Sequence, residues 1–525
     1  MPAQFASTIP LVTGEPVVRL MAHTADPYDL ALASARTCYS PGLRTVAEVN
    51  DKLRENMGKA LFNAGHHTPF QHPTFIFGLE NVSRQFVWSF LHSHPFYNSE
   101  QSSQRYNLVT EAKVYVPPAL RPAQRRVYEQ ATLQAWENYR RIYELLVADY
   151  RGLMANLGRK KGQTEKQVES DAQKKSMETA RYVLPVAAFT SLYHTVSGIE
   201  LQRYLRMMNT GDVPAETRVV VQKMVDAVKA VDPNFFSVSQ GPMPEELTLE
   251  AKLAQAAPVT SADVEAENAR FDEQLDGKFA KLVSHDPNAE GLVADSVREV
   301  LGLPEASMSD DEALELLMHP GKNPYLLDTL NTWTHSPLMR ALNHAQYTFK
   351  KKISHTADSQ DQRHRMTPGS RPLLTRVHTA KPDYILPEVL KDNGDAVALY
   401  RQTMDVLWEA KNALLAEGVS AEDATYLLPN AVSVRFTQSG SMLNFMHKWR
   451  LRTCFLAQWE IYQSSMDELA QVAAVHPRLA RHQGPPCFVR DGLVADKTPE
   501  GPCPEGGHWC GVDVWRNFPK VKRPF

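Results

Sequence analysis

One short polar segment of the sequence concentrates cationic side chains. The stretch DSQDQRHRMTPGSRP, residues 358–372, contains Arg363, His364, Arg365 and Arg371. A guanidinium group donates two parallel hydrogen bonds and keeps its charge at physiological pH, so such a cluster suits a phosphate or a carboxylate. A solvated surface charge run is the alternative explanation. The rest of the chain has to decide between an anion site and a solvated surface.

A second group of reactive side chains lies near the C-terminus, in the Gly- and Pro-rich segment that follows residue 475. It consists of Cys487, Cys503, His508 and Cys510. Three thiolates and an imidazole form a common tetrahedral zinc site, although this spacing is not that of a C-x-x-C knuckle. We expect a structural zinc site without a catalytic role. A surface extension with free thiols is the alternative.

Bulk composition predicts that any anion is recognised locally. The 525 residues include 57 basic and 60 acidic side chains, for a formal net charge of -3, which creates no general field for nucleic acid or an anionic membrane. No apolar run is long enough to cross a bilayer, and the N-terminal residues lack the pattern of a secretory signal. Five cysteines are too few for a disulfide framework. We therefore expect a cytoplasmic protein without nucleic-acid or membrane partners.

The chain contains an internal duplication. From Pro185 and from Pro429 onward, two segments align without a gap as far as Glu216 and Glu460. Earlier landmarks recur in the same order. The matched segments are 19–36 with 281–298, HHTPFQHPTFIF at 66 with THSPLMRALNHAQYTF at 334, and KSMETARYVLP at 175 with EGVSAEDATYLLP at 417. Such a repeat predicts two copies of one structural unit.

Periodicity within each copy predicts a mixed α and β fold. Residues 131–154 and 397–418 carry apolar side chains at steps of three and four, which is typical of long amphipathic helices. Residues 72–82 and 345–353 are rich in aromatic and branched side chains and predict strands. We expect long helices packed on a mixed sheet in each copy. The predicted divisions are an N-terminal domain 1–236, a linker 237–278 with a surface helix, a C-terminal domain 279–475 and an extension 476–525.

The landmarks together resemble the flavin-dependent thymidylate synthase family over residues 19–236 and 281–475. The motifs, in family order, are ARTCYS at 35, HHTPFQH at 66, VSRQF at 82, SSQRY at 102, ARYVLP at 180, QDQRHR at 360 and AQWEI at 457. This resemblance implies an enzyme that converts dUMP to dTMP. Its carbon donor would be methylenetetrahydrofolate, its hydride carrier FAD and its reductant NADPH. The family is tetrameric, with active sites where subunits meet.

Each copy departs from the family pattern where the other keeps it. In the first copy Ser93, His94 and Pro95 stand in place of Arg-His-Arg, with a shift of one residue as the alternative. In the second copy Thr425 replaces the arginine of ARxVLP, and Met208 of the first copy lies opposite Arg452. The complementary losses predict one composite site from both copies. We accordingly expect a single-chain pseudodimer that forms a homodimer, a pseudotetramer with half the family's number of sites.

Roles for individual residues follow from the resemblance. Arg452 is implied as the catalytic cation that stabilises the enolate formed when the uracil ring attacks through C5, and one such donor is worth roughly 3 to 4 kcal/mol. Without the resemblance it would be an ordinary arginine of an amphipathic helix. The residues implied for the nucleotide are Ser103, Arg105, Arg181, Gln360 and Arg363, and those implied for the flavin are His66, Thr68, Arg363, His364 and Arg365.

Two further functions remain open from the sequence. The short segment MTPGSRP after Arg365 allows a flavin- and folate-dependent enzyme that acts on another pyrimidine nucleotide. A non-catalytic nucleotide-binding relative is the other alternative, because family residues early on the long helix are changed. The replacements are Ser197 and Ile199 in the first copy and Ser441 and Leu443 in the second.

Overall fold

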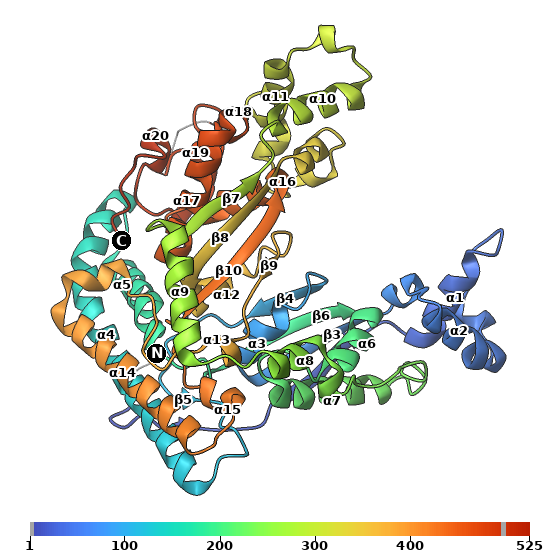
Figure 1. Ribbon diagram of the computed structural model, residues 1–525. Helices are drawn as coiled ribbons and strands as arrows, with labels where there is room; N and C mark the ends of the chain where they lie inside the picture. Colours follow the sequence, from blue (N-terminus) through green and yellow to red (C-terminus); the bar gives the residue numbers. More distant parts are fainter. Residues whose placement is uncertain (1–4, 495–499) are drawn as a thin grey trace.

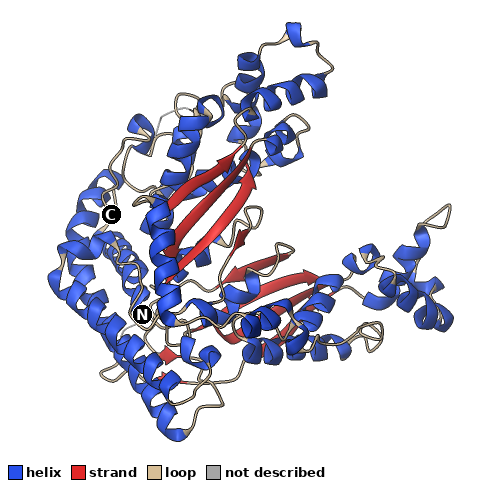
Figure 2. Cartoon of the chain, in the orientation of Figure 1, coloured by secondary structure: helices blue, strands red, loops and turns tan. Residues whose placement is uncertain are grey.

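The computed structural model describes residues 5–494 and 500–525, and it contains the same architecture twice. Each copy has a four-stranded sheet covered by helices, and the two sheets diverge from a shared layer of long helices (Figures 1 and 2). The mixed α/β class is confirmed. The expected mixed sheet is wrong, because every neighbouring pair in both four-stranded sheets is antiparallel. Buried and more exposed side chains alternate along the strands, as expected for antiparallel sheets with one covered face.

The first copy builds its sheet in the order β2-β3-β6-β4, and β1 pairs separately with β5. Helices α1 and α2 project from one end of this sheet, whereas α4 and α5 form the layer shared with the second copy (Figure 1). The elements are β1 (Leu11–Val12), β2 (Val17–His23), α1 (Pro27–Thr37), α2 (Gly58–Asn63), β3 (Thr74–Ser83), α3 (Arg84–Leu91), β4 (Tyr97–Gln101), β5 (Ala112–Lys113), α4 (Pro122–Lys161), α5 (Glu165–Ala180), β6 (Phe189–Ser197), α6 (Gly198–Met207) and α7 (Pro214–Lys229).

The second copy repeats this plan with the strand order β7-β8-β10-β9. Its helices α10 and α11 project like α1 and α2 (Figure 1). The elements are β7 (Ala280–His285), α10 (Ala289–Leu301), α11 (Asp310–Met318), β8 (Gln346–Ser354), α12 (His355–Asp361), β9 (Gly369–Ser370), α13 (Leu374–Val377), α14 (Gly394–Ala416), α15 (Ala421–Thr425), β10 (Ser433–Ser441), α16 (Met442–Arg452) and α17 (Trp459–Val475). The tail adds α18 (Pro477–Ala480), α19 (Pro486–Arg490) and α20 (Val514–Asn517).

Equivalent serines begin the short helices that follow β3 and β8. Ser83 caps α3, and the carboxylate of Glu216 accepts hydrogen bonds from the Ser83 backbone N–H at 2.7 Å and from its Oγ at 2.6 Å. The hydroxyl of Tyr426, from the other copy, donates to the same carboxylate at 2.7 Å. The second copy repeats this group with Ser354, Glu460 and Tyr182. Each copy therefore completes a buried polar group of the other.

A pseudo-two-fold axis passes near Pro185 and Pro429, which form an antiparallel bridge. On either side, the backbone N–H of Val186 donates to the Leu428 carbonyl at 2.8 Å, and Asn430 donates to the Leu184 carbonyl at 2.8 Å. One continuous apolar core extends from the first copy through α4 and α14 into the second. The two copies are thus joined by a shared interior.

The segment between the copies contains α8 (Leu249–Ala256) and α9 (Ser261–Leu275). Helix α9 packs on the second sheet, where Asp272 accepts hydrogen bonds from Arg435 Nε at 2.8 Å and from Lys352 Nζ at 2.6 Å. Within residues 5–494 and 500–525, no helix has both the length and the apolar character needed to cross a membrane.

Candidate active site

The cationic segment of the sequence begins within a short helix, α12, and continues in the turn after it. Ser354 caps α12 by accepting a hydrogen bond from the Ala357 backbone N–H at 3.1 Å, and α12 ends at Asp361. The turn after it carries Arg363, His364 and Arg365. Helix α12 lies beside α3, because the indole N–H of Trp88 donates to Asp358 of α12 at 2.9 Å. The segment is therefore built into the contact between the two copies.

Arg452, the last residue of α16, reaches back to this turn. Its Nε donates to Nε2 of His364 at 2.8 Å, and its Nη2 donates to the Gln360 carbonyl at 3.2 Å. Burial lowers the pKa of His364 well below its ordinary value, and the charge of Arg452 acts in the same direction. His364 is therefore a neutral imidazole that accepts at Nε2 and carries its proton on Nδ1.

Gln458, which follows α16, connects residues of both copies. Its Oε1 accepts hydrogen bonds from Arg181 of the first copy and from Gln360 of the second. Its amide nitrogen donates to the hydroxyl of Tyr182. Arg181 and Gln360 are thus held around one amide oxygen, although they come from different copies.

Arg105 also crosses between the copies. Its Nη2 donates to the Leu456 carbonyl of the second copy at 2.7 Å, and its Nε forms an ion pair with Glu178 of α5. The backbone N–H of Arg105 donates to Oγ of Ser103 at 3.1 Å, which fixes the Ser-x-Arg turn. Four of the five residues predicted to bind the nucleotide are buried or partly buried: Ser103, Arg105, Arg181 and Gln360. The fifth, Arg363, has a side chain that is 47% exposed.

Five arginines in this region repel one another. Burial lowers the pKa of Arg452 to about 10, and the charges of Arg105 and Arg363 contribute, against an opposing effect of Asp361. Burial and the charge of Arg105 lower the pKa of Arg181 to about 10. Burial lowers the pKa of Arg84 to about 9, and Arg181 and Arg363 add to this effect. A bound dianion would relieve this repulsion, and we call Arg84, Arg105, Arg181, Arg363 and Arg452 the arginine cluster.

Several buried polar atoms of this region lack hydrogen-bond partners among the described residues. They include Nε of Arg84, on the first copy, and Oε1 of Gln360 and of Gln362, on the second. Buried polar atoms without partners are rare in folded proteins, and a bound ligand is one common explanation. Sequence reasoning assigned no role to Arg84 or to Gln458. The signal was available, since both lie inside the motifs VSRQF and AQWEI.

A cavity of about 710 Å³ lies beside the turn that carries Arg363, His364 and Arg365. Its volume falls within the usual range for cofactor sites, roughly 300 to 1,000 Å³. Trp333 lines it, and its buried indole N–H has no acceptor among the described residues. Arg365 is fixed at its edge by donating to the Pro95 carbonyl at 3.0 Å. Cationic, aromatic and polar groups here fit a large anionic cofactor such as a flavin dinucleotide.

A buried network of two lysines and two carboxylates stabilises the turn. Lys351 of β8 and Lys448 of α16 each contact both Asp361 and Glu468, at distances of 2.8 to 3.1 Å. All four side chains have an exposed fraction of 0%. Burial alone would raise the pKa of Asp361, but Lys351 and Lys448 outweigh it and hold the pKa well below the ordinary value. This network, which the sequence analysis did not identify, fixes the end of α12 two residues before Arg363.

Comparisons with known proteins agree with the duplication. The sequence model of the family described as thymidylate synthase complementing protein matches residues 19–234 and again residues 281–478. The chain belongs to this family. It is 33% identical over 249 residues to the flavin-dependent thymidylate synthase of Geobacter sulfurreducens. This alignment covers 46% of this chain and 96% of that protein. It is 28% identical over 226 residues to the flavin-dependent thymidylate synthase of Clostridium tetani, covering 42% and 86%.

This thymidylate synthase complementing protein contains two copies in one chain. The pseudo-two-fold axis therefore relates the candidate site to a second, equivalent position. Equal spacing from the capping serines Ser83 and Ser354 places His92 opposite Arg363, which favours the one-residue shift in the alignment. At this second position Asp358 binds Arg371 through contacts of 2.8 and 3.2 Å. Burial lowers the pKa of His92 to about 4, so this imidazole is neutral. Arg371 at this counterpart position is therefore already neutralised by Asp358.

Two predicted flavin residues of the family pattern lie apart from the cavity. His66 and Thr68 are exposed in the turn that precedes β3, and neither of these two described residues lines the 710 Å³ cavity. Thr74, at the start of β3, does line it. Within one chain, the structure therefore joins Arg363, His364 and Arg365 in one place and leaves His66 and Thr68 facing solvent.

Four positions depart from the family pattern early on the long helices, and the structure shows where each of them lies. Ser197 and Leu443 both line the 710 Å³ cavity. Ser441 caps α16 by accepting a hydrogen bond from the Asn444 backbone N–H at 3.4 Å. Ile199 is buried in the core of the first copy.

The predicted zinc site is not formed. Among the described residues, no three His, Cys, Asp or Glu side chains lie close enough to hold a metal ion. Cys487, Cys503 and Cys510 instead pack in or against an apolar cluster between the tail and α17. Burial raises the pKa of Cys503 to about 11 and that of Cys510 to about 12. His508 lines a second cavity, which Cys510 also lines.

Proposed function

We propose that this protein is a flavin-dependent thymidylate synthase, converting dUMP to dTMP with methylenetetrahydrofolate, in one composite active site per chain. The observation that carries the proposal is the arginine cluster. Its members come from both copies, and they surround buried polar atoms that lack partners among the described residues. The relatives from Geobacter and Clostridium, both described as flavin-dependent thymidylate synthases, support the reaction.

In this proposal the phosphate of dUMP binds at Arg105, Arg181 and Ser103. A phosphate dianion accepts charge-assisted hydrogen bonds, and guanidinium groups supply them in pairs. Glu178 already accepts from Arg105 and orients its fork. Because the arginines repel one another before the nucleotide arrives, dianion binding is favoured by the charge that it neutralises.

Arg452 and Gln360 face the pyrimidine ring in this proposal. The ring must act as a nucleophile at C5, and negative charge then develops on a ring carbonyl oxygen. Arg452 is held in place by His364 and stabilises that charge. Because His364 is neutral, it accepts the hydrogen bond without competing for the anion.

The 710 Å³ cavity is the proposed flavin site, with Arg363, His364 and Arg365 as the residues that hold it. The bound flavin supplies the hydride for the reduction that completes the methyl group. Arg363 borders both the nucleotide region and this cavity, so it would orient the two ligands with respect to each other. NADPH is the proposed reductant.

A homodimer is the proposed assembly. His66 and Thr68 are exposed and belong to a family motif, so a second chain offers the means to bring them to a flavin. Light scattering should then give twice the chain mass of 59.0 kDa. We also propose a cytoplasmic location, which agrees with five free cysteines, and retain the divisions at residues 236, 278 and 475.

The alternative of another pyrimidine nucleotide gains no support from the shortened segment MTPGSRP, because its Arg371 is bound to Asp358. The deciding experiment measures tritium release from C5-labelled dUMP, with labelled dCMP in parallel and with flavin, folate and NADPH present. We expect release from dUMP alone. Release from dCMP would favour the alternative substrate, and a flavin-free protein inactive on both would favour a non-catalytic relative.

A further inference from the structure

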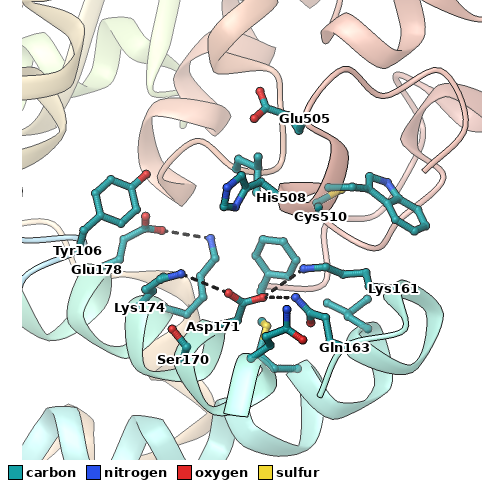
Figure 3. A pocket seen from close by; sticks show the side chains of 18 of the residues that line it. Tyr106, Lys161, Gln163, Ser170, Asp171, Lys174, Glu178, Glu505, His508 and Cys510 are labelled. Atoms are coloured by element: carbon teal, nitrogen blue, oxygen red, sulfur yellow. Dashed lines mark hydrogen bonds and ion pairs between the residues drawn. The ribbon is translucent and has the colours of Figure 1, made fainter. Parts of the chain in front are cut away.

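A cavity of about 540 Å³ lies between the first copy and the C-terminal tail (Figure 3). The C-terminal end of α4 and one side of α5 form one wall, and residues 505–525 contribute the other. The tail wall lies beyond residue 478, where the match to the family ends. One wall of this cavity therefore lies outside the part of the chain that matches the family.

One pair of amines in the cavity shares a single carboxylate. Asp171 lies 3.1 Å from Nζ of Lys161 and 3.6 Å from Nζ of Lys174, and it also accepts from the amide of Gln163 at 3.0 Å (Figure 3). Burial opposes ionisation of Asp171, but Gln163 and Lys161 outweigh it and lower its pKa. The carboxylate is thus ionised and still provides only one negative charge for two positive ones.

A second carboxylate is shared in the same way. Glu178 forms ion pairs with Arg105 and, at 3.5 Å, with Lys175. Nζ of Lys175 also lies over the ring of Phe525, 4.3 Å from its centre. Burial lowers the pKa of Lys175 to about 8, although Glu178 opposes this shift. An anion next to Lys175 would therefore stabilise its charged form.

Aromatic side chains line much of the rest of the cavity, which is also lined by Glu505. The aromatic residues are Tyr106, His508, Trp509 and Phe525, and apolar side chains such as Leu157 lie between them. The indole N–H of Trp509 donates to the Val512 carbonyl at 3.2 Å, which fixes the ring. Flat apolar walls next to a row of amines suit a planar ring that carries an acidic group.

We propose that this cavity binds a small anion that carries an aromatic ring, with its acidic group on Lys161, Lys174 and Lys175. The inference rests on the proposed synthase function for the identity of the ligand. Two participants of that reaction have this chemistry: the p-aminobenzoyl-glutamate end of the folate and a pyrimidine nucleotide such as dTMP. Arg105 lines the cavity and belongs to the arginine cluster, so the ligand lies next to the nucleotide.

Isothermal titration with two probes tests the proposal. The first probe is p-aminobenzoyl-glutamate, titrated into the full-length protein. The second is dTMP, titrated into Arg181→Gln so that the arginine cluster contributes less. We expect one of the two to bind with one equivalent per chain. Removing two amines, in Lys161→Gln with Lys174→Gln, should weaken that binding at least tenfold.

The neighbouring lysine gives a matched control. Lys160 is exposed, lies in the same last turn of α4 and does not line the cavity, so Lys160→Gln should bind the probe like the parent protein. Trp509 fluorescence should change on binding, and Trp509→Phe should lose that optical change while the heat remains. Binding of neither probe, or equal weakening by Lys160→Gln, would overturn the proposal. Since binding is measured without turnover, a failure here leaves the synthase proposal intact, and an inactive synthase leaves this result unaffected.

Discussion

Nε of Arg452 lies 2.8 Å from Nε2 of His364 and donates a hydrogen bond to it, although the two residues are 88 positions apart. The contact joins the end of α16 to the turn after α12. It orients a partly buried guanidinium whose neighbours include Arg105 and Arg363 of the cluster as well as Asp361. This orientation is what the proposed chemistry requires of the cation at the pyrimidine ring.

Replacement of Arg452 should therefore affect the chemical step more than binding. We expect Arg452→Ala to lower turnover by about 100- to 1,000-fold, because one donor to a developing oxyanion is lost. Arg452→Lys should retain an intermediate rate. Tritium release from C5-labelled dUMP provides the measurement. Arg206→Ala, on the equivalent helix α6 of the first copy, is the control and should keep the parent rate; full turnover in Arg452→Ala would refute the role.

Arg181 should determine nucleotide affinity. Its removal in Arg181→Gln takes away a charged hydrogen-bond donor, worth about 1.5 to 3 kcal/mol, so the Kd for dUMP should rise by roughly ten- to a hundredfold. Calorimetry gives this Kd directly. The control changes the counterpart position, where Asp358→Asn with Arg371→Gln removes a neutral pair. An equal loss of affinity in this control would show that the counterpart position also binds nucleotide.

The duplication made much of the composite site predictable from the sequence. Motifs kept in one copy and lost in the other indicated that Arg181 and Gln360 act together, and in the structure both contact Gln458. The order of motifs along the chain could not predict that His66 and Thr68 are exposed. Sequence spacing likewise could not reveal that the tail cysteines pack in or against an apolar cluster.

The buried ion network shows where sequence reasoning reaches its limit. The segment AQYTFKKKI was correctly predicted as a strand, and its alternation sends Lys351 to one face and Lys350 and Lys352 to the other. Three consecutive lysines normally indicate a solvated strand. Lys351 is buried only because Asp361 and Glu468, from distant parts of the chain, neutralise it.

Breaking this network should destabilise the protein strongly. Lys448→Met leaves Asp361 and Glu468 buried with a single lysine, and the loss of one partner from a buried ion group costs about 3 to 5 kcal/mol. Chemical denaturation should show this decrease in the free energy of unfolding. Lys352→Met, which removes a partly exposed pair with Asp272, should cost less than about 1 kcal/mol. Equal effects of the two substitutions would contradict the structural role of the network.

Glu216 should make stability depend on pH. Burial raises its pKa from 4.5 to about 7, although hydrogen bonds from Ser83 and Tyr426 oppose the shift. The folded state therefore keeps a proton that the unfolded state has lost. The associated stability is fully present below pH 4.5 and disappears as the pH rises through 7, a change on the order of 3 kcal/mol.

The substitution Glu216→Gln should remove this dependence. Denaturation at pH 5 and pH 8 should then show a smaller difference in the free energy of unfolding than in the parent protein. Glu250→Gln, at an exposed position of α8, is the control and should keep the parent difference. An unchanged difference in Glu216→Gln would contradict the raised pKa.

The stoichiometry of dUMP binding tests the central claim, that two copies in one chain form one site, most directly. Calorimetry of the purified protein should give one dUMP per chain. That binding should weaken in Arg181→Gln, from the first copy, and equally in Arg363→Gln, from the second. Two dUMP molecules per chain that both remain in Lys161→Gln with Lys174→Gln, or binding that depends on the residues of one copy alone, would contradict the claim.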